Sequence, residues 1–447
     1  MFKIHELVLA SEGRLLSGDS DKIVSGISID SRKIKKGEAF IAFKGGNFDG
    51  HDFIPEAVKK GALCVIAEKP VKRIKGVALI RVKNSLESLG KIARYNRNRY
   101  NLPVIAVTGS SGKTTVKDMI ARVLSEKFKV LSTQGTQNNH ICLPLTLLKL
   151  DDSYGAVVLE LGTNHFGEIE YLSRIASANI GVITNIGPSH LKYFKSLKGV
   201  FKEKHALLKN LKKPAVAVLN ADDLYLKKVL MNKGRSLFTI GVGIDNRADY
   251  QASQIHSVNG AYAFKVNKRL RFALGSLGYY NIYNSLTAIA IARIFGIGYG
   301  KIKSALEDFQ APAGRLEIIK RRGLRFIDST YNSNPASLSY ALDLLNSLKV
   351  KGRKIAVLGD MLELGKSSLA LHKEAIEKAL LVCDNLVAVG TLSSLSARAK
   401  KNKDKNIITC SNSLQARKAL RRDLKVTDRD IILVKGSRGM KMEEVFR

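Results

Sequence analysis

Residues 107–115 read VTGSSGKTT, and this stretch decides the fold of the chain. The apolar run PVIAV, which begins at Pro103, leads into it. The apolar residues after it recur at helical steps, at Val116, Met119, Ile120, Val123 and Leu124. This order of strand, glycine-rich loop and helix predicts a phosphate-binding loop, because glycines turn backbone N–H groups toward phosphate and a helix N-terminus favours an anion. A chance Gly-Lys-Thr turn is the alternative, and it does not explain both flanking elements.

Each part of this loop has an expected role toward a bound nucleotide. The Lys113 ammonium would reach the β- and γ-phosphates, and the Thr114 hydroxyl would hold Mg²⁺. The other loop residues expected to surround the phosphates are Gly109, Ser110, Ser111, Gly112 and Thr115. The loop is two residues shorter than the common GxxxxGK[ST] pattern, so a strict pattern match fails.

The rest of the chain divides into three blocks around this loop. Residues 1–98 alternate short strand-like runs (VSGISID, EAFIAFKG, LCVIAE, GVALIRV) with one helical stretch, FIPEAVKKG, and the basic segment ARYNRNRYN reads as a linker. Residues 99–311 contain the continuous apolar runs GAVVLELG, IGVITNIG and PAVAVLNA, typical of buried parallel strands. Residues 312–447 restart the pattern with LRFIDS, KIAVLGD, NLVAVG, NIITC and DIILVKG. We therefore expect an α/β protein of three domains.

The composition narrows the class of protein. Lys and Arg number 74 against 39 Asp and Glu, a net charge of +35, which suits a nucleic-acid binder, a polyanionic substrate or a lysine-rich solvated surface. Because the lysines are scattered along the chain and no zinc-finger pattern occurs, the solvated surface is favoured. No apolar run approaches membrane-spanning length, the first residues lack a signal-peptide apolar region, and the four cysteines form no CxxC pair. We expect a cytoplasmic protein that binds no nucleic acid and has no stable membrane insertion.

Two further residues lie where parallel strands end. Glu160 closes the GAVVLELG strand, and His190 follows IGVITNIG in the sequence GPSH. The carboxyl ends of strands form the ligand edge of an open α/β sheet, and a carboxylate and an imidazole beside phosphate suit Mg²⁺ or Mn²⁺. The alternatives are a cap or ion pair for Glu160 and a hydrogen-bonded loop histidine for His190.

A lysine in the segment HLKYFKSLKGVFKEKH, residues 190–205, interrupts an apolar face. In a helix over residues 199–212, the residues of that face are Val200, Lys204, Leu207, Leu208 and Leu211. Lys192, Lys195, Lys198, Lys202 and Lys209 would face solvent. A buried lysine has a lowered pKa, and a neutral amine can add CO₂ to form a carbamate that serves as an oxygen ligand. Snorkelling of the Lys204 ammonium toward water is the alternative.

Taken together, these residues resemble the Mur ligases, the ATP-dependent amide-forming family of peptidoglycan synthesis. TGSSGKTT, Glu160, His190 and Lys204 occur in the family order, followed by NIYNSL, AGRLE and STYNSNP, and the resemblance covers essentially the whole chain. Six segments resemble the member that joins D-alanyl-D-alanine to UDP-N-acetylmuramoyl-tripeptide: DSRKIKKGEAFIAFKG, FDGHDF, ELGTNHFGEI, YNSNP, GDMLELG and LVKGSRGMKMEEV. The DNPR box of the diaminopimelate-adding relative is absent.

The resemblance implies an architecture and a cofactor set. It implies a small α/β UDP-sugar-binding domain at 1–98, an ATP-binding phosphate-loop domain on a mainly parallel sheet at 99–311, and a Rossmann-like ligase domain at 312–447. Thr114 and Glu160 would hold one Mg²⁺, and His190 with a carbamylated Lys204 would help hold a second. We expect a monomer.

The resemblance also assigns residues to the substrates. The nucleotide would contact Asn281, Asn284, Arg315 and Asp328. The muropeptide would contact Asn138, Asn139, Thr163, Asn164 and His165, and the UDP-sugar Ser31, Arg32 and Lys44. Lys435 and Ser437 would lie near the incoming dipeptide.

Three positions depart from the family pattern. The usual GxHNxxN reads GYYNIYN, with Tyr280 in the histidine position. Ser329 stands where an acidic residue is usual, with Asp328 one place earlier, and Cys142 replaces a glycine in NNHICLP. A folylpolyglutamate-synthase-like ligase and a nucleic-acid-dependent ATPase are the two rival readings, and only the first shares the metal ligands.

Overall fold

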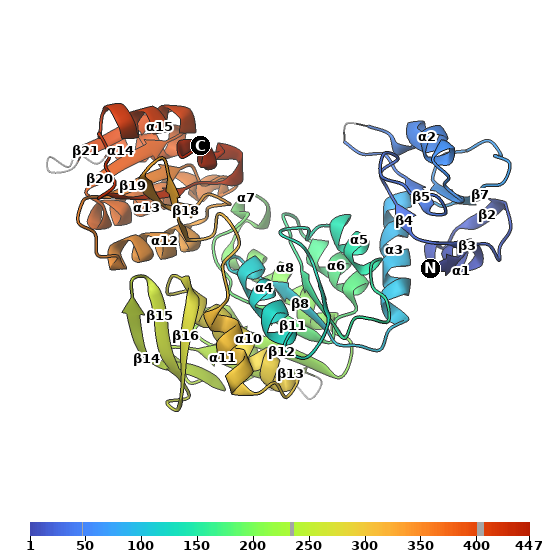
Figure 1. Ribbon diagram of the computed structural model, residues 1–447, viewed down its shortest axis with the longest axis horizontal. Helices are drawn as coiled ribbons and strands as arrows, with labels where there is room; N and C mark the ends of the chain where they lie inside the picture. Colours follow the sequence, from blue (N-terminus) through green and yellow to red (C-terminus); the bar gives the residue numbers. More distant parts are fainter. Residues whose placement is uncertain (47, 233–236, 400–405) are drawn as a thin grey trace.

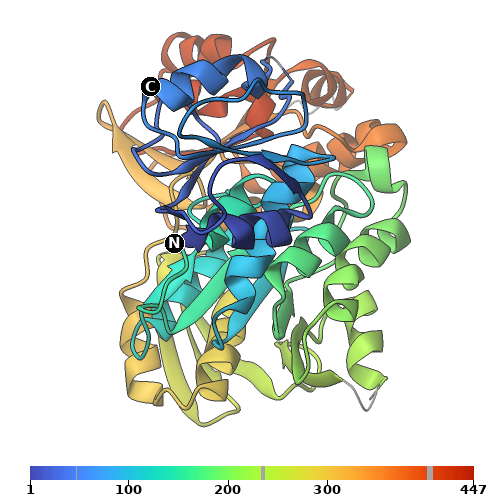
Figure 2. The same cartoon turned by 90° about the vertical axis from the view of Figure 1, so that its right-hand side faces the viewer.

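The computed structural model describes residues 1–46, 48–232, 237–399 and 406–447. Its three α/β domains are arranged as an open V, with the central domain below and the other two above its opposite ends (Figure 1). Turned by 90°, the N-terminal domain lies in front of the C-terminal domain (Figure 2). In the described ranges, no helix combines the length and the apolar character needed to cross a bilayer.

The N-terminal domain contains a five-stranded sheet of order β2-β7-β6-β5-β4 and a two-stranded ribbon of β1 and β3. Its strands are β1 Phe2–Lys3, β2 Arg14–Ser17, β3 Ile23–Val24, β4 Ile27–Ser28, β5 Ala39–Ala42, β6 Cys64–Ala67 and β7 Ala78–Arg81. Its helices are α1 Ile4–Ser11, η1 Gly50–Phe53, α2 Ile54–Lys59 and α3 Ser85–Asn98. The predicted strands are confirmed, whereas the sequence analysis found only α2 among the helices.

The predicted linker ARYNRNRYN is wrong, because most of it is the end of helix α3. Two of its polar residues, Asn96 and Arg97, are buried against the central domain. The Asn96 amide donates to Leu147 O and Leu150 O, and the Arg97 guanidinium donates to Ala176 O and Ser177 O. Polar residues can lie in a buried interface when their donors are paired with backbone carbonyls. Composition alone does not reveal such partners, so the polar segment was predicted to be a loop.

The central domain is built on a nine-stranded sheet of order β16-β15-β14-β13-β12-β11-β8-β10-β9. Its strands are β8 Val104–Thr108, β9 Val130–Ser132, β10 Ala156–Glu160, β11 Ile180–Ile183, β12 Ala215–Asn220, β13 Leu237–Gly243, β14 Tyr250–Val258, β15 Ala261–Val266 and β16 Leu270–Leu277. Its helices are α4 Lys113–Leu124, α5 Cys142–Leu147, α6 Glu168–Ala176, α7 Leu191–Phe194, α8 Leu197–Lys209, α9 Leu224–Met231, α10 Asn281–Ile294 and α11 Tyr299–Glu307. The pairs from β9 to β14 are parallel, as expected, and β14, β15 and β16 add an antiparallel extension that was not predicted.

The C-terminal domain has a six-stranded sheet of order β17-β18-β22-β19-β20-β21, parallel except for β17. Its strands are β17 Glu317–Arg321, β18 Leu324–Ser329, β19 Lys354–Gly359, β20 Asn385–Val389, β21 Asn406–Cys410 and β22 Ile431–Lys435. Its helices are α12 Pro335–Ser347, η2 Gly365–Ser367, α13 Ser368–Val382, α14 Thr391–Arg398, α15 Ser413–Arg422, η3 Arg438–Met440 and η4 Met442–Val445. The five predicted strands are confirmed.

The cores follow the sequence pattern closely. On α4, the predicted apolar face is wholly buried, at Val116, Met119, Ile120, Val123 and Leu124. These side chains pack against the strands of the central sheet in one apolar cluster. This packing places the N-terminus of the helix, and the phosphate loop before it, at the carboxyl edge of the sheet.

Candidate active site

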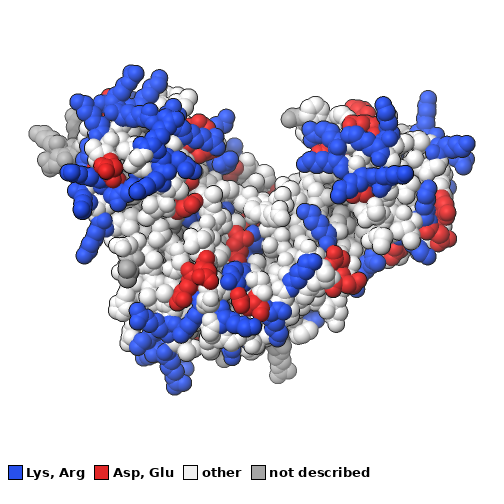
Figure 3. All heavy atoms as spheres, in the orientation of Figure 1, with Lys and Arg blue, Asp and Glu red and all other residues white. Residues whose placement is uncertain are grey.

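A cavity of about 900 Å³ lies where the three domains meet. Figure 3 shows the molecule hollowed between the N-terminal and C-terminal domains. The central domain lines the cavity with its phosphate loop, Glu160 and His190, the C-terminal domain with Arg315 and Lys435, and the N-terminal domain with the start of α3. One cavity therefore collects most of the residues that the sequence analysis singled out.

The phosphate loop is held in shape by the segment that follows β11. The Thr184 hydroxyl donates to Ser111 O at 2.6 Å, and the Asn185 side chain accepts from Ser111 N at 3.0 Å. A Cβ at Gly109, whose φ is +151°, would lie 1.9 Å from the Thr184 hydroxyl oxygen, so only glycine fits there. Lys113 is folded back, donating to Gly109 O at 2.9 Å, and burial lowers the pKa of its ammonium.

Thr114 and Glu160 come together at the ends of α4 and β10. The Thr114 hydroxyl donates to Glu160 Oε2 at 2.6 Å and accepts from Arg315 at 2.8 Å. The Asn138 amide donates to Glu160 Oε1 at 2.7 Å. This buried pair of hydroxyl and carboxylate oxygens beside the loop has the hard-ligand chemistry that Mg²⁺ requires. Among the described residues, no cluster of three or more His, Cys, Asp or Glu could hold a metal, so further ligands would have to come from other groups.

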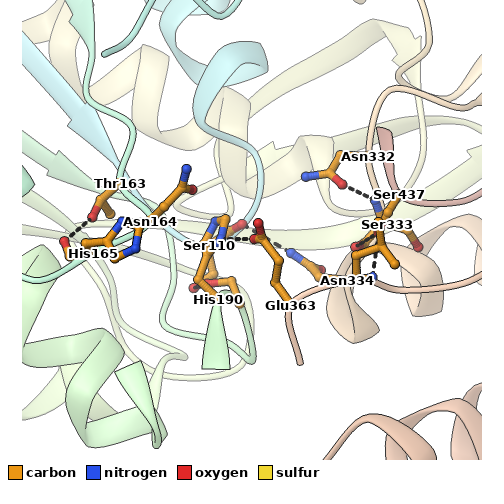
Figure 4. A network of polar contacts seen from close by, with 12 residues as sticks. Ser110, Thr163, Asn164, His165, His190, Asn332, Ser333, Asn334, Glu363 and Ser437 are labelled. Carbon is orange, nitrogen blue, oxygen red and sulfur yellow. Dashed lines mark hydrogen bonds and ion pairs between the residues drawn. The ribbon is translucent and has the colours of Figure 1, made fainter. Parts of the chain in front are cut away.

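His190 and Lys204 both lie within reach of the Lys113 charge. His190 precedes α7 with a φ of +50°, and its Nδ1 lies 2.5 Å from Glu363 Oε2 of the C-terminal domain (Figure 4). Burial and the neighbouring Lys113 lower the pKa of His190, which favours the neutral ring that binds metals.

Lys204 lies on the buried face of α8, as its spacing predicted. Its side chain is 1% exposed, whereas Lys202 and Lys209 face solvent. Burial, with a smaller contribution from Lys113, holds the pKa of Lys204 well below its usual range. Within the described part of the chain, Lys204 Nζ makes no hydrogen bond or ion pair with another side chain or the backbone. The near-complete burial of Lys204 favours a neutral amine over an ammonium that reaches water. Lys204 does not itself line the cavity.

The expected nucleotide contacts lie partly in the cavity. Asn281 and Asn284 line it, and Asn284 Oδ1 is buried without a hydrogen-bond partner in the described chain, as suits an acceptor reserved for a ligand. Arg315 lines it too, with its guanidinium 4.1 Å from the Tyr331 ring centroid. Asp328 does not line the cavity, because its carboxylate accepts from the backbone and hydroxyl of Thr330; Ser329 lines it instead.

The expected substrate contacts divide into two groups. Asn138, Asn139, Thr163, Asn164 and Lys435 line the cavity. Ser437 lines a smaller neighbouring cavity of about 260 Å³, and the His165 side chain lines neither. The structure does not bring Ser31, Arg32 or Lys44 to the cavity. Ser31 donates to Glu56, Arg32 pairs with Asp30, and Lys44 is exposed on the N-terminal domain.

Tyr280 stands in the position where the family usually has histidine. It is buried and packs against the phosphate loop. Its hydroxyl accepts a hydrogen bond from the Asn185 amide, and its ring stacks on the ring of Tyr340 in α12, with ring centroids 4.5 Å apart. A Cβ at Gly112 would lie 2.7 Å from the Tyr280 ring. Tyr280 therefore connects the phosphate loop to the C-terminal domain.

The comparisons with known proteins match each part of this architecture. The Mur ligase middle domain matches residues 107–292, the Mur ligase glutamate ligase domain residues 314–438, and the Mur ligase family catalytic domain residues 23–97. The chain belongs to the Mur ligase family.

The relatives and neighbours span the same length as this Mur ligase. It is 35% identical to a UDP-N-acetylmuramoyl-tripeptide–D-alanyl-D-alanine ligase of Bacillus subtilis, covering 95% of this chain and 93% of that one. A crystal structure of MurF from Acinetobacter baumannii aligns with a TM-score of 0.91 at 30% identity, covering 99% and 97%. MurF from Thermotoga maritima in complex with ADP aligns with a TM-score of 0.84 at 29% identity, covering 96% and 97%.

The sequence analysis missed the contacts that three residues of the C-terminal domain make with the central domain. Glu363, Asn334 and Tyr340 meet the central domain only because the C-terminal domain packs against it. Asn334 caps α12 and also donates to Ser110 O at 3.2 Å. Its place in STYNSNP marked a family motif, but no local pattern indicated which distant loop it would contact.

Proposed function

We propose that this Mur ligase joins D-alanyl-D-alanine to UDP-N-acetylmuramoyl-tripeptide, with cleavage of ATP to ADP and phosphate. The observation that carries the proposal is the single cavity in which the phosphate loop, Glu160 and Arg315 face residues of all three domains. Relatives that carry this activity in their names align over nearly the whole chain. The muropeptide would lie along Asn138, Asn139, Thr163 and Asn164, and the dipeptide beside Lys435 and Ser437.

The reaction needs the arrangement because a carboxylate is a poor acyl donor. Transfer of the ATP γ-phosphoryl to the terminal carboxylate of the tripeptide gives an acyl phosphate. The free amine of the dipeptide then attacks the acyl carbon, and the tetrahedral intermediate expels phosphate. Lys113 and Arg315 place positive charge where the transferred phosphoryl oxygens gather negative charge, which stabilises the transition state.

Residues of this chain would hold the Mg²⁺ ions that such a transfer uses. Thr114 and Glu160 fit one ion, and His190 with a carbamylated Lys204 would help hold a second. Bound there, Mg²⁺ supplies charge neutralisation and Lewis acidity at the phosphates. Carbamylation would convert the neutral Lys204 amine into an anionic oxygen ligand.

The same reasoning gives a cellular setting. Cys64, Cys142 and Cys410 form no disulfide, as is usual for cysteines in proteins of reducing compartments. The proposed substrates are nucleotide-linked and water-soluble. We therefore propose that the enzyme acts in the cytoplasm.

The test is phosphate release with UDP-N-acetylmuramoyl-tripeptide and D-alanyl-D-alanine, omitting each in turn. We expect turnover only with both present, and a product whose mass equals the two substrates minus water. Equal ATP turnover without either peptide would contradict the ligase assignment. Stimulation by nucleic acid instead would support the rival ATPase, and turnover with a folate and glutamate would support the folylpolyglutamate-synthase-like rival.

A further inference from the structure

The segment GDMLELG, residues 359–365, begins at the last residue of strand β19, and none of its residues has a role in the proposed reaction. Its Glu363 crosses from the C-terminal to the central domain and places Oε2 2.5 Å from His190 Nδ1. The two residues are 173 positions apart in the chain. Figure 4 shows them facing each other between the Thr163–His165 side of the cavity and the Asn332–Asn334 side.

The backbone around this contact is shaped for a close approach. Lys192 N donates to Glu363 O at 2.9 Å, so main chain and side chain both engage the start of α7. His190 and Glu363 both adopt left-handed φ values, +50° and +64°, which are uncommon for residues other than glycine. At Gly365, whose φ is +61°, a Cβ would lie 3.1 Å from Lys192 Cα. Such local conformations persist only where the surrounding structure holds them.

The segment is also fixed from within its own domain. Leu362 N donates to the Ser437 hydroxyl at 2.8 Å, and Ser437 N donates to Asp360 O at 3.1 Å. Ser437, Arg438, Glu363 and His190 all line the smaller cavity. Glu363 is thus a rigid projection of the C-terminal domain, about 40% exposed, that meets the central domain at His190.

We propose that Glu363 is a positioning residue for His190, so that the cation site which His190 helps to form is completed only when the C-terminal domain docks. The carboxylate accepts a hydrogen bond from the Nδ1–H group. This bond fixes the orientation of the imidazole ring and leaves Nε2 as the ring nitrogen that can bind a cation. A carboxylate that orients a ligating histidine in this way raises metal affinity in other proteins. The inference rests on the proposed ATP- and Mg²⁺-dependent function.

Docking and cation binding are coupled in this arrangement. Asn334 contacts the phosphate loop, and Tyr340 stacks on Tyr280, through the same domain interface. A cation that binds better when Glu363 is in place must, by linkage, favour the docked arrangement by the same factor. The cation would therefore bind tightly only when the C-terminal domain is docked, before the phosphoryl group is transferred.

The experiment measures Mn²⁺ binding by electron paramagnetic resonance, with a non-hydrolysable ATP analogue and no peptide substrate. Glu363→Ala should weaken one Mn²⁺ site about 10-fold or more, the range for removing the carboxylate partner of a ligating histidine. Glu363→Gln should retain most of the affinity, because its amide oxygen can still accept from Nδ1. Glu374→Ala, at an exposed position on α13, is the matched control and should bind Mn²⁺ like the parent protein.

Domain docking is followed separately by fluorescence. The chain has no tryptophan, so Tyr340→Trp places a single reporter at the domain interface. Mn²⁺ with the nucleotide analogue should change its emission, and Glu363→Ala should shift that change to higher Mn²⁺ concentration. A purely structural effect would instead lower the melting temperature and leave the Mn²⁺ dependence unchanged.

The outcomes separate the two claims. If Glu363→Ala binds Mn²⁺ as tightly as the parent protein, the positioning role is overturned while the proposed function stands. If the parent protein itself binds no Mn²⁺ with nucleotide, the cation sites of the proposed function fail, and the positioning role fails with them.

Discussion

Lys204 illustrates how burial changes what a residue can do. In the fold, its stem lies between Val200 and Leu207 on the apolar face of α8, and its pKa is lowered by burial and by Lys113. The other lysines of residues 190–205 are exposed to solvent. Chemistry that needs a neutral amine is therefore restricted to one lysine of the segment.

We expect Lys204→Ala to reduce the rate of ligation by about 100-fold or more, the scale for losing a charged partner at a reacting site. A short carboxylic acid such as acetate should restore part of the activity, because it can fill the cavity and supply the missing oxygen ligand. Steady-state kinetics with and without the acid provides the measurement. Lys202→Ala, at an exposed position on the same helix, is the control. If Lys202→Ala lost activity and Lys204→Ala did not, the wrong lysine would have been assigned.

Lys435 is a second buried lysine with a different setting. Its Nζ donates to the Ser329 hydroxyl at 3.0 Å and to Asn332 O at 2.9 Å, and burial lowers its pKa to about 7. Between pH 7 and its ordinary pKa of 10.5, the unfolded chain binds a proton that the folded protein does not. Stability must therefore rise with pH across this window and level off below pH 7.

We expect Lys435→Met to remove this contribution, which is of the order of a few kcal/mol. The melting temperature of the variant relative to the parent protein, measured from pH 6 to pH 10, should fall as the pH rises, because only the parent protein gains. A difference that stays constant with pH would show that Lys435 titrates normally in the folded state.

At the scale of elements, β9 and α4 jointly hold Glu160 in place. The Lys117 ammonium on α4 is buried, contacts Asp118 and donates to Thr133 O at 2.7 Å just after β9. The Thr133 hydroxyl in turn accepts from Glu160 N at 3.0 Å. The carboxylate at the end of β10 is thus fixed through its own backbone, by Lys117 and Thr133, which lie outside the phosphate loop.

Thr133→Val should cost about 1–3 kcal/mol of stability, since it leaves the buried Glu160 N–H without an acceptor while keeping the side-chain volume. Thr133→Ser keeps the hydroxyl and should cost less. The melting temperature measures stability, and Mn²⁺ affinity measures whether Glu160 has moved. Equal melting temperatures for the valine variant and the parent protein would show that the Glu160 N–H finds another acceptor.

At the scale of the whole molecule, the N-terminal and C-terminal domains stand apart on the face that Figure 3 shows, with the cavity between them. Ser31, Arg32 and Lys44 lie outside this cavity, although the UDP-sugar and the reacting carboxylate belong to one substrate. A long substrate reaching from the N-terminal domain to the phosphate loop would span the hollow. Lysines and arginines cover both upper domains on that face, with acidic residues between them.

We expect the molecule to become more compact when both nucleotide and muropeptide bind, because contacts to all three domains draw them together. Small-angle X-ray scattering should show a smaller radius of gyration with an ATP analogue and UDP-N-acetylmuramoyl-tripeptide than with either alone. Arg315→Ala, which removes the contact to Thr114, should lessen the change. An unchanged radius with both ligands would indicate that the open V already binds the substrate.

The sequence by itself determined the local parts of this protein. The strand, loop and helix around VTGSSGKTT, the strand that ends at Glu160, and the buried face of α8 all follow from short-range periodicity, because burial repeats at fixed steps along one element. The sequence misjudged α3, whose buried polar residues are satisfied only by distant carbonyls. The sequence analysis quoted the motifs that contain Glu363 and Asn334, but it did not indicate the contacts that these residues and Tyr340 make with the central domain. Only the tertiary structure decided these contacts, since packing of one domain on another depends on shape and hydrogen bonding between segments that no local pattern connects.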